Sequence, residues 1–174
     1  MKLNEKIVDF INKNCTGIYK ENRLQLEDLC KKLNLKCFSA EYPPEISGAI
    51  IKNDDGEGYT IYVNKDHPKS RQRFTISHEI GHYISYLNGS FSKEGLEKNK
   101  GFEDKFMYYR KDGNNSNAEI EANLIAAELL MPEERVKTLI RDNLTIEEMA
   151  DIFYVSQAAM TIRVQKLFPG LMDF

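Results

Sequence analysis

The residues best suited to chemistry lie together in the pentapeptide His78-Glu79-Ile80-Gly81-His82. On a helix, positions i and i+4 lie one turn apart on the same face, so both imidazoles can reach one metal ion. Glu79 would then lie beside that ion, where its carboxylate can take a proton from a water molecule. This spacing predicts a catalytic zinc site, with His78 and His82 as ligands and Glu79 as general base.

Hydrophobic periodicity places the pentapeptide on a helix expected over residues 72–87. The apolar residues of this segment form one stripe that should face the core: Ile76, Ile80, Tyr83, Ile84 and Leu87. His78 and His82 lie on a different stripe, with Gly81 and Ser85. A single buried histidine is most often an ordinary core residue. Two histidines off the apolar stripe, with an acid between them, favour a metal site instead.

A catalytic zinc ion usually has three protein ligands and one open position, so a third ligand must lie outside the pentapeptide. The candidates are His67, Glu119 and Glu121. Glu119 has a rival role, because Ser116 and Glu119 have the spacing of a helix capping box. The rival role of Glu121 is that of a solvated acid in the first turn of a helix. The residues alone do not favour any one of these three candidates as the third ligand.

The composition limits the classes of protein to which the chain can belong. The chain has 174 residues, 41% of them hydrophobic, which is typical of one globular domain or of one domain with a small appendage. A net charge of −3 gives no general attraction to nucleic acid or to an anionic membrane. Cys15, Cys30 and Cys37 form no C-x-x-C pair, so we expect reduced, buried thiols. With no signal peptide and no run of about 18 apolar residues, the sequence predicts a cytoplasmic protein without a membrane span.

Sequence patterns also predict the elements around the site. Before the 72–87 helix we expect helices over 4–13 and 24–34, a strand over 37–42, and a hairpin of 46–51 with 59–63. After it we expect a helix over 118–131, whose apolar stripe consists of Ile120, Leu124, Ala127 and Met131. A second helix should begin at Pro132. Further on, we expect a capping box at Thr145–Glu148 and a helix over 157–167. Residues 88–117 are weakly patterned, which fits either a substrate-shaping lid or a surface insertion.

Two long segments resemble the ImmA/IrrE family of metallopeptidases. They are Arg71-Gln72-Arg73-Phe74-Thr75-Ile76-Ser77-His78-Glu79-Ile80-Gly81-His82 and Glu119-Ile120-Glu121-Ala122-Asn123-Leu124-Ile125-Ala126-Ala127-Glu128-Leu129-Leu130-Met131-Pro132. Smaller matches at Ile46–Ala49 and Val63-Asn64 extend the resemblance over about residues 46–135. The resemblance implies that the third ligand is Glu119, with Glu121 as second choice. It also implies an α+β, zincin-like fold, in which a small sheet lies beside the two ligand-bearing helices.

Helical geometry is consistent with that choice of ligand. Glu119, Asn123 and Ala126 share one face of their helix, and small residues there would allow a close approach to the histidine helix. Glu121 lies about 200° around the helix from Glu119, so both cannot point at one zinc ion. His67 precedes Pro68 in a polar connector, where we expect a surface position.

The family resemblance extends to function and domain organisation. It implies a zinc-dependent endopeptidase with one zinc ion per chain and a protein substrate, often a helix-turn-helix repressor encoded nearby in a mobile element or stress locus. Members commonly end in a helix-turn-helix-like segment, which 144–167 fits, so we divide the chain into 1–140, the peptidase domain, and 141–174, the helical tail. Tyr154 stands where such turns usually carry glycine, which argues against DNA reading by the tail.

Two alternatives belong to other classes of function. One is a regulatory DNA-binding protein with a structural or sensory zinc site, for which Arg141, Arg163 and Lys166 supply modest positive charge. The other is a toxin-like partner of a repressor-type antitoxin. A structural zinc site has no use for Glu79, which favours the peptidase.

Two features of the expected site stay open at this point. Gly81 inside a helix costs about 1 kcal/mol relative to alanine, which a close approach of the second helix or of the substrate would explain. The group that stabilises the oxyanion is not assigned. Its candidates are Tyr83, Tyr86, Tyr108, Tyr109, Arg71 and Arg73.

Overall fold

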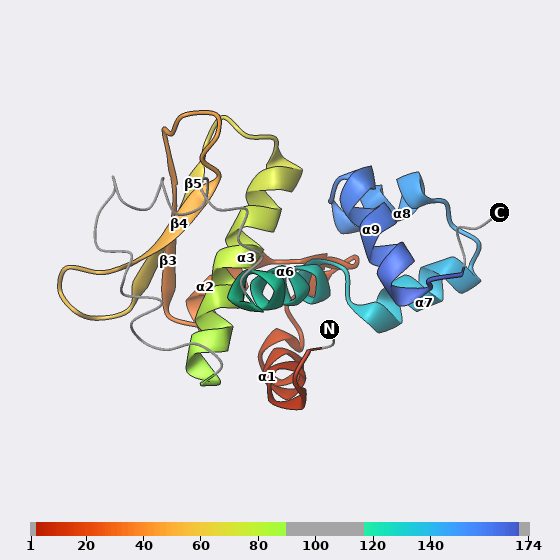
Figure 1. Cartoon of the computed structure of the whole chain (residues 1–174), viewed down its shortest axis with the longest axis horizontal. Coiled ribbons are helices and arrows are strands. Elements are labelled where there is room, and N and C mark those ends of the chain that lie inside the picture. Colours follow the sequence, from red (N-terminus) through yellow and green to blue (C-terminus); the bar gives the residue numbers. More distant parts are fainter. Residues whose placement is uncertain (1–2, 90–116, 171–174) are drawn as a thin grey trace.

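A three-stranded mixed sheet lies beside the helix that carries His78 and His82 (Figure 1). The structure is a computed structural model that describes residues 3–89 and 117–170. In the sheet, β5 (Tyr59–Asn64) is central, paired in parallel with β3 (Leu35–Ala40) and antiparallel with β4 (Gly48–Lys52). The expected α+β class and the expected hairpin are both confirmed.

The N-terminal elements differ from the expectation at one point. They are α1 (Glu5–Cys15), β1 (Tyr19–Lys20), β2 (Arg23–Leu24) and α2 (Leu26–Lys32). The helix expected over 24–34 was placed too early, because Leu24 pairs with Tyr19 in an antiparallel ribbon and the helix begins only at Leu26. The expected strand over 37–42 likewise lies two residues earlier, as β3. Leu24 and Leu29 are fully buried and anchor this region in the core.

Two long helices pack against each other through small residues. α3 (Lys69–Leu87) carries His78 and His82, and α6 (Asn117–Leu130) carries Glu119. A Cβ atom added at Gly81 would lie 2.7 Å from the carbonyl oxygen of Ala122 and 3.0 Å from its Cα. Close approach of the second helix therefore explains the glycine inside α3.

The buried face of α6 is not the stripe that the sequence analysis selected. Ala122, Ile125, Ala126 and Leu129 are fully buried, whereas Ile120, Leu124 and Ala127 are only half-buried. Hydrophobic scales favour the larger side chains, but at this helix contact the short alanine side chains are the ones that fit. The stripe was therefore wrong at these three residues, whereas its fourth member, Met131, just after the helix, is buried as expected.

Three further helices lie at the opposite end of the molecule from the sheet (Figure 1): α7 (Glu133–Arg141), and, in the tail expected over 141–174, α8 (Ile146–Phe153) and α9 (Gln157–Leu167). The predicted capping box is confirmed, because Thr145 Oγ1 accepts from the Glu148 N–H and the Glu148 carboxylate accepts from the Thr145 N–H. Tyr154 ends α8 in the left-handed region, with φ 57° and ψ 53°. Such a backbone costs a residue with a Cβ about 1–2 kcal/mol.

Arg163 joins the tail to α6. Its side chain is 6% exposed, its Nε donates to the Met131 carbonyl at 3.0 Å, and its guanidinium pairs with Glu128. Arg163 therefore does not contribute to a basic surface on α9, where Lys166 is exposed. The domain boundary between residues 140 and 141 stays a prediction.

Two other expectations concern parts of the chain away from the site. The weakly patterned segment 88–117, for which a lid and a surface insertion were both considered, falls almost entirely outside the described residues. In the part of the chain that the structure describes, no helix combines the length and the apolar character that crossing a membrane requires.

Candidate metal centre

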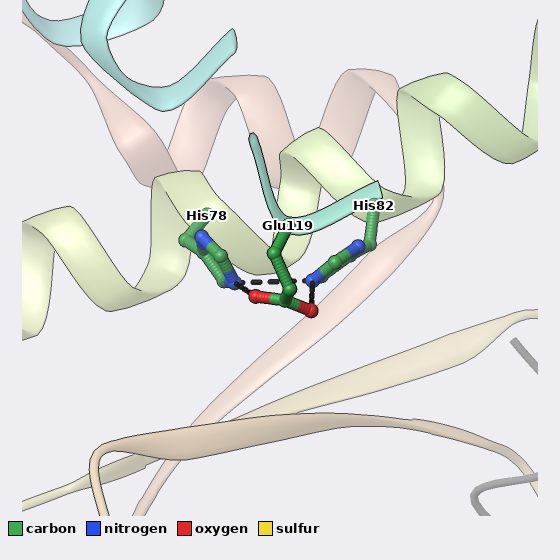
Figure 2. A group of neighbouring side chains, drawn as sticks. All are labelled: His78, His82 and Glu119. Carbon is green, nitrogen blue, oxygen red and sulfur yellow. Dashed lines mark hydrogen bonds and ion pairs between the residues drawn. The ribbon is translucent and has the colours of Figure 1, made fainter. Parts of the chain in front are cut away.

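His78 and His82 project from one face of α3 toward the same point (Figure 2). Their Nε2 atoms lie 3.0 Å apart and their rings are nearly perpendicular, at 89°. Four residues of helix separate them, which is one turn, so this arrangement follows from local geometry. Both rings are largely shielded from solvent, with 12% and 6% of the side chains exposed.

Glu119 completes the group from the first turn of α6. Its Oε2 lies 3.2 Å from His78 Nε2, and its Oε1 lies 3.2 Å from His82 Nε2. Figure 2 shows the carboxylate facing both imidazoles. One donor atom from each of the three residues lies within 4.8 Å of the others, and among the described residues this group could hold a metal ion.

The spacing of these atoms fits a tetrahedral zinc site. Zinc lies about 2.0–2.2 Å from nitrogen and oxygen ligands, so two ligands of a tetrahedral ion lie about 3.3 Å apart. The distances from each Nε2 atom to the carboxylate are 3.2 Å, and the distance between the two nitrogens is 3.0 Å. Two imidazoles and one carboxylate are also a donor set that zinc takes in catalytic sites. The residues present therefore fit the ion.

Asn123 determines the tautomer of His78. Its Oδ1 lies 3.0 Å from His78 Nδ1, and an amide oxygen can only accept a hydrogen bond. A neutral His78 must therefore carry its proton on Nδ1, which leaves the lone pair of Nε2 directed toward Glu119 and His82. Hydrogen bonds of this kind orient metal-binding histidines. Asn123 was expected on the same helix face as Glu119, but its contact with His78 was not predicted from the sequence.

The charges of the group favour an ionised Glu119. Burial by itself would raise the pKa of its carboxyl, but hydrogen bonds and charge interactions with His78 and His82 outweigh burial and lower it to about 2. Burial would likewise lower the pKa of His78, but the hydrogen bond to Glu119 and the charges of Glu79 and Glu119 raise it. Glu119 thus carries a negative charge where a cation would bind.

Glu79 is buried next to the group. Its side chain is 2% exposed, and its Oε2 has no hydrogen-bond partner among the described residues. An acceptor that is buried without a partner costs about 1–3 kcal/mol. A carboxylate oxygen kept in this state is suited to accepting a proton from a substrate or from water.

The two rival ligands lie elsewhere. His67 is 9% exposed and its Nε2 lies 2.8 Å from the Pro44 carbonyl oxygen, so the expected surface position was wrong. The connector folds inward here because Asn64, fully buried, donates to the carbonyls of the loop before β4. Glu121 is half-buried on another side of α6. Neither residue joins the group of His78, His82 and Glu119.

Four candidates for stabilising the oxyanion can be placed. The rings of Tyr83 and Tyr86 pack against Tyr59, with centroids 5.4 and 6.3 Å from it. Arg71 donates to Ser47 Oγ at 3.0 Å and Arg73 donates to the Leu24 carbonyl at 3.1 Å. Each therefore has a packing or anchoring role. Tyr108 and Tyr109 lie outside the described residues.

Comparison with known proteins agrees with this geometry. Residues 30–165 match the model of a peptidase family described as the IrrE N-terminal-like domain. No curated protein matches the chain. The match covers most of the 174 residues, including both ligand-bearing helices and α7 to α9. The chain belongs to the IrrE N-terminal-like domain family and is a metallopeptidase of the IrrE/ImmA type.

Proposed function

We propose that the protein is a zinc-dependent endopeptidase in which His78, His82 and Glu119 hold the metal and Glu79 is the general base. The observation that carries this proposal is the convergence of two imidazole nitrogens, 3.0 Å apart, with the Glu119 carboxylate, whose two oxygens lie 3.2 Å from them, beside the buried carboxylate of Glu79. A bound zinc ion would polarise the scissile carbonyl and acidify a water molecule.

The residues of the chain have distinct roles in this reaction. Glu79 accepts a proton from the attacking water at a carboxylate oxygen and returns it to the nitrogen of the leaving amine. Asn123 keeps the His78 proton on Nδ1. Glu119 is ionised, because its pKa lies far below neutral, and it contributes the negative charge of the ligand set.

For the substrate, we propose a helix-turn-helix repressor, whose cleavage would release genes from repression. The support is the membership of the chain in the IrrE N-terminal-like domain family, together with the family resemblance of its two motifs. The DNA-binding alternative receives no support from the tail, because Arg163 is buried in an ion pair with Glu128. A toxin-like role would use the same site and would require no cleavage of a repressor.

A Glu79→Gln variant tests the proposal. The amide has nearly the same shape but cannot accept the proton, so we expect loss of at least about 100-fold in the rate of repressor cleavage, with zinc binding retained. Cleavage is followed with the purified repressor encoded beside the gene, and zinc by elemental analysis. Glu121→Gln, a change on α6 outside the group, is the matched control and should cleave at the normal rate. Normal cleavage by Glu79→Gln would refute the general-base role.

A further inference from the structure

Tyr154 is an aromatic residue in a backbone conformation that favours glycine. It ends α8 with φ 57°, and its side chain remains 44% exposed. In the left-handed region a Cβ lies too close to the following carbonyl oxygen, a cost that glycine avoids. A tyrosine in this position therefore requires a compensating role for its side chain.

Two guanidinium groups from earlier elements of the chain lie against the ring of Tyr154. The Cζ atoms of Arg23, in β2, and Arg73, in α3, lie 5.4 and 5.7 Å from the ring centroid. Both distances fall within the range of a cation–π interaction. We call these three residues the Tyr154 cluster. It connects the end of α8 with β2 and with the helix that carries His78 and His82.

Hydrogen bonds hold the cluster in place. Arg23 donates from Nε to the Ile152 carbonyl at 3.0 Å and from Nη2 to the Asp151 carbonyl at 2.9 Å. These carbonyls belong to the last turn of α8, and that of Asp151 also accepts from the Tyr154 N–H at 3.2 Å. Arg73 donates to the Leu24 carbonyl at 3.1 Å. Burial and the nearby charge of Arg23 lower the pKa of Arg73, so the aromatic face offsets a repulsion between two cations.

The tail thus contacts both ligand-bearing helices. It reaches α3 through Tyr154 and Arg73, and it reaches α6 through the Arg163–Glu128 ion pair. Arg73 precedes His78 by five residues and lies about 140° around the helix from it, on the side away from the metal group. Glu128 lies nine residues after Glu119, near the other end of α6.

We propose that Tyr154 is a positioning residue of the peptidase. It holds the tail against the side of α3 that faces away from the metal group, and this contact keeps His78 and His82 aligned with Glu119. This proposal rests on the metal site proposed above. The tail then holds the two ligand-bearing helices in their relative positions. The left-handed tyrosine is retained because its ring makes the contact that glycine cannot make.

Two substitutions in the full-length protein test this role. Tyr154→Gly removes the ring and suits the left-handed backbone, so the melting temperature should change little. Amide hydrogen exchange over residues 69–82 should nevertheless become about three- to tenfold faster, and zinc affinity in competition with a chelator should fall about three- to tenfold, as expected for two lost cation–π contacts. Tyr154→Phe keeps the aromatic face and should restore both quantities to their normal values.

The outcomes separate this proposal from the metal site itself. Normal exchange over residues 69–82 in Tyr154→Gly would overturn the positioning role, and so would equal losses in the Gly and Phe variants. If the unsubstituted protein takes up no zinc, the proposed function fails. Even then, the exchange rates of Tyr154→Gly and the unsubstituted protein over residues 69–82 decide whether Tyr154 stabilises α3.

Discussion

At the scale of residues, α6 supplies two different groups to the same histidine. Glu119 and Asn123 are one helical turn apart, and they contact opposite nitrogens of His78: Oε2 of Glu119 lies near Nε2 and Oδ1 of Asn123 near Nδ1. The first contact orients a potential ligand toward the ring, and the second determines which ring nitrogen is free to bind a metal. Because Glu119 and Asn123 are one turn apart on α6, they determine both the orientation of the His78 ring and the ring nitrogen that carries its proton.

Replacing Glu119 with alanine should remove a ligand. We expect zinc affinity to fall by more than the roughly 10–100-fold that loss of a supporting residue costs. Glu121→Ala and His67→Ala are the controls and should bind zinc nearly as well as the unsubstituted protein. The measurement is chelator competition. A Glu119→Ala protein with normal affinity and a slightly lower melting temperature would instead favour the capping role.

Replacing Asn123 with alanine should have a smaller effect of the same kind. Without the amide acceptor, His78 is free to place its proton on Nε2, where a metal cannot bind. We expect zinc affinity to fall by about 10–100-fold at unchanged folding stability, because Asn123 is exposed. The nearby substitution Leu124→Ala does not touch His78 and serves as control for the loss of packing on α6. Equal affinities of Asn123→Ala and the unsubstituted protein would contradict this role.

At the scale of elements, the contact between α3 and α6 brings His78, His82 and Glu119 together. Gly81 lies between the two histidines on α3, and the backbone of Ala122 lies directly against it. A side chain at position 81 would push the helices apart, and Glu119 on α6 would move with its helix. The small residues at this contact, Gly81 and Ala122, are therefore part of the site, although they do no chemistry.

Gly81→Ala should destabilise the protein. In an open helix this change stabilises by about 1 kcal/mol, but here the new methyl group meets backbone atoms that cannot rotate away. We expect a loss of about 1–3 kcal/mol in the free energy of unfolding by urea. Adding Ala122→Gly should give no rescue, because the nearest atoms belong to the Ala122 backbone. A Gly81→Ala protein of normal or higher stability would show that α6 does not approach this closely.

At the scale of the whole molecule, the tail is attached at two places that differ in character. The Arg163–Glu128 pair is mostly buried, whereas the Tyr154 cluster lies partly at the surface. Glu128 also accepts from the Glu133 N–H at the start of α7, at 3.2 Å. One carboxylate therefore connects α6, α7 and α9.

Arg163→Met should destabilise the chain as a whole. The change leaves Glu128 without its cation and the Met131 carbonyl without a donor, so we expect a loss of about 3 kcal/mol in the free energy of unfolding. Lys166→Met, at an exposed position of the same helix, should change it by less than about 0.5 kcal/mol. Thermal and urea unfolding give both values. If Arg163→Met were as stable as the Lys166 variant, the ion pair would not join the tail to α6.

Short-range features of this protein could be predicted from its sequence because they depend on a few neighbouring residues. The one-turn spacing of His78 and His82 on a helix is local geometry, and so are the capping box at Thr145 and the hairpin of β4 with β5. For the third ligand, the family resemblance selected Glu119, and the structure brings that residue to both histidines. The residues alone had left three candidates level.

The remaining features were decided by packing between segments far apart in the chain. The burial of His67 and of Arg163, and the choice of the face of α6 that is buried, each depend on what lies opposite. Hydropathy describes the size and polarity of a side chain, but it contains no information on how close a residue from another segment approaches. Gly81 shows the difference: the sequence marks it as costly in a helix, and only the approach of Ala122 explains why no larger residue fits.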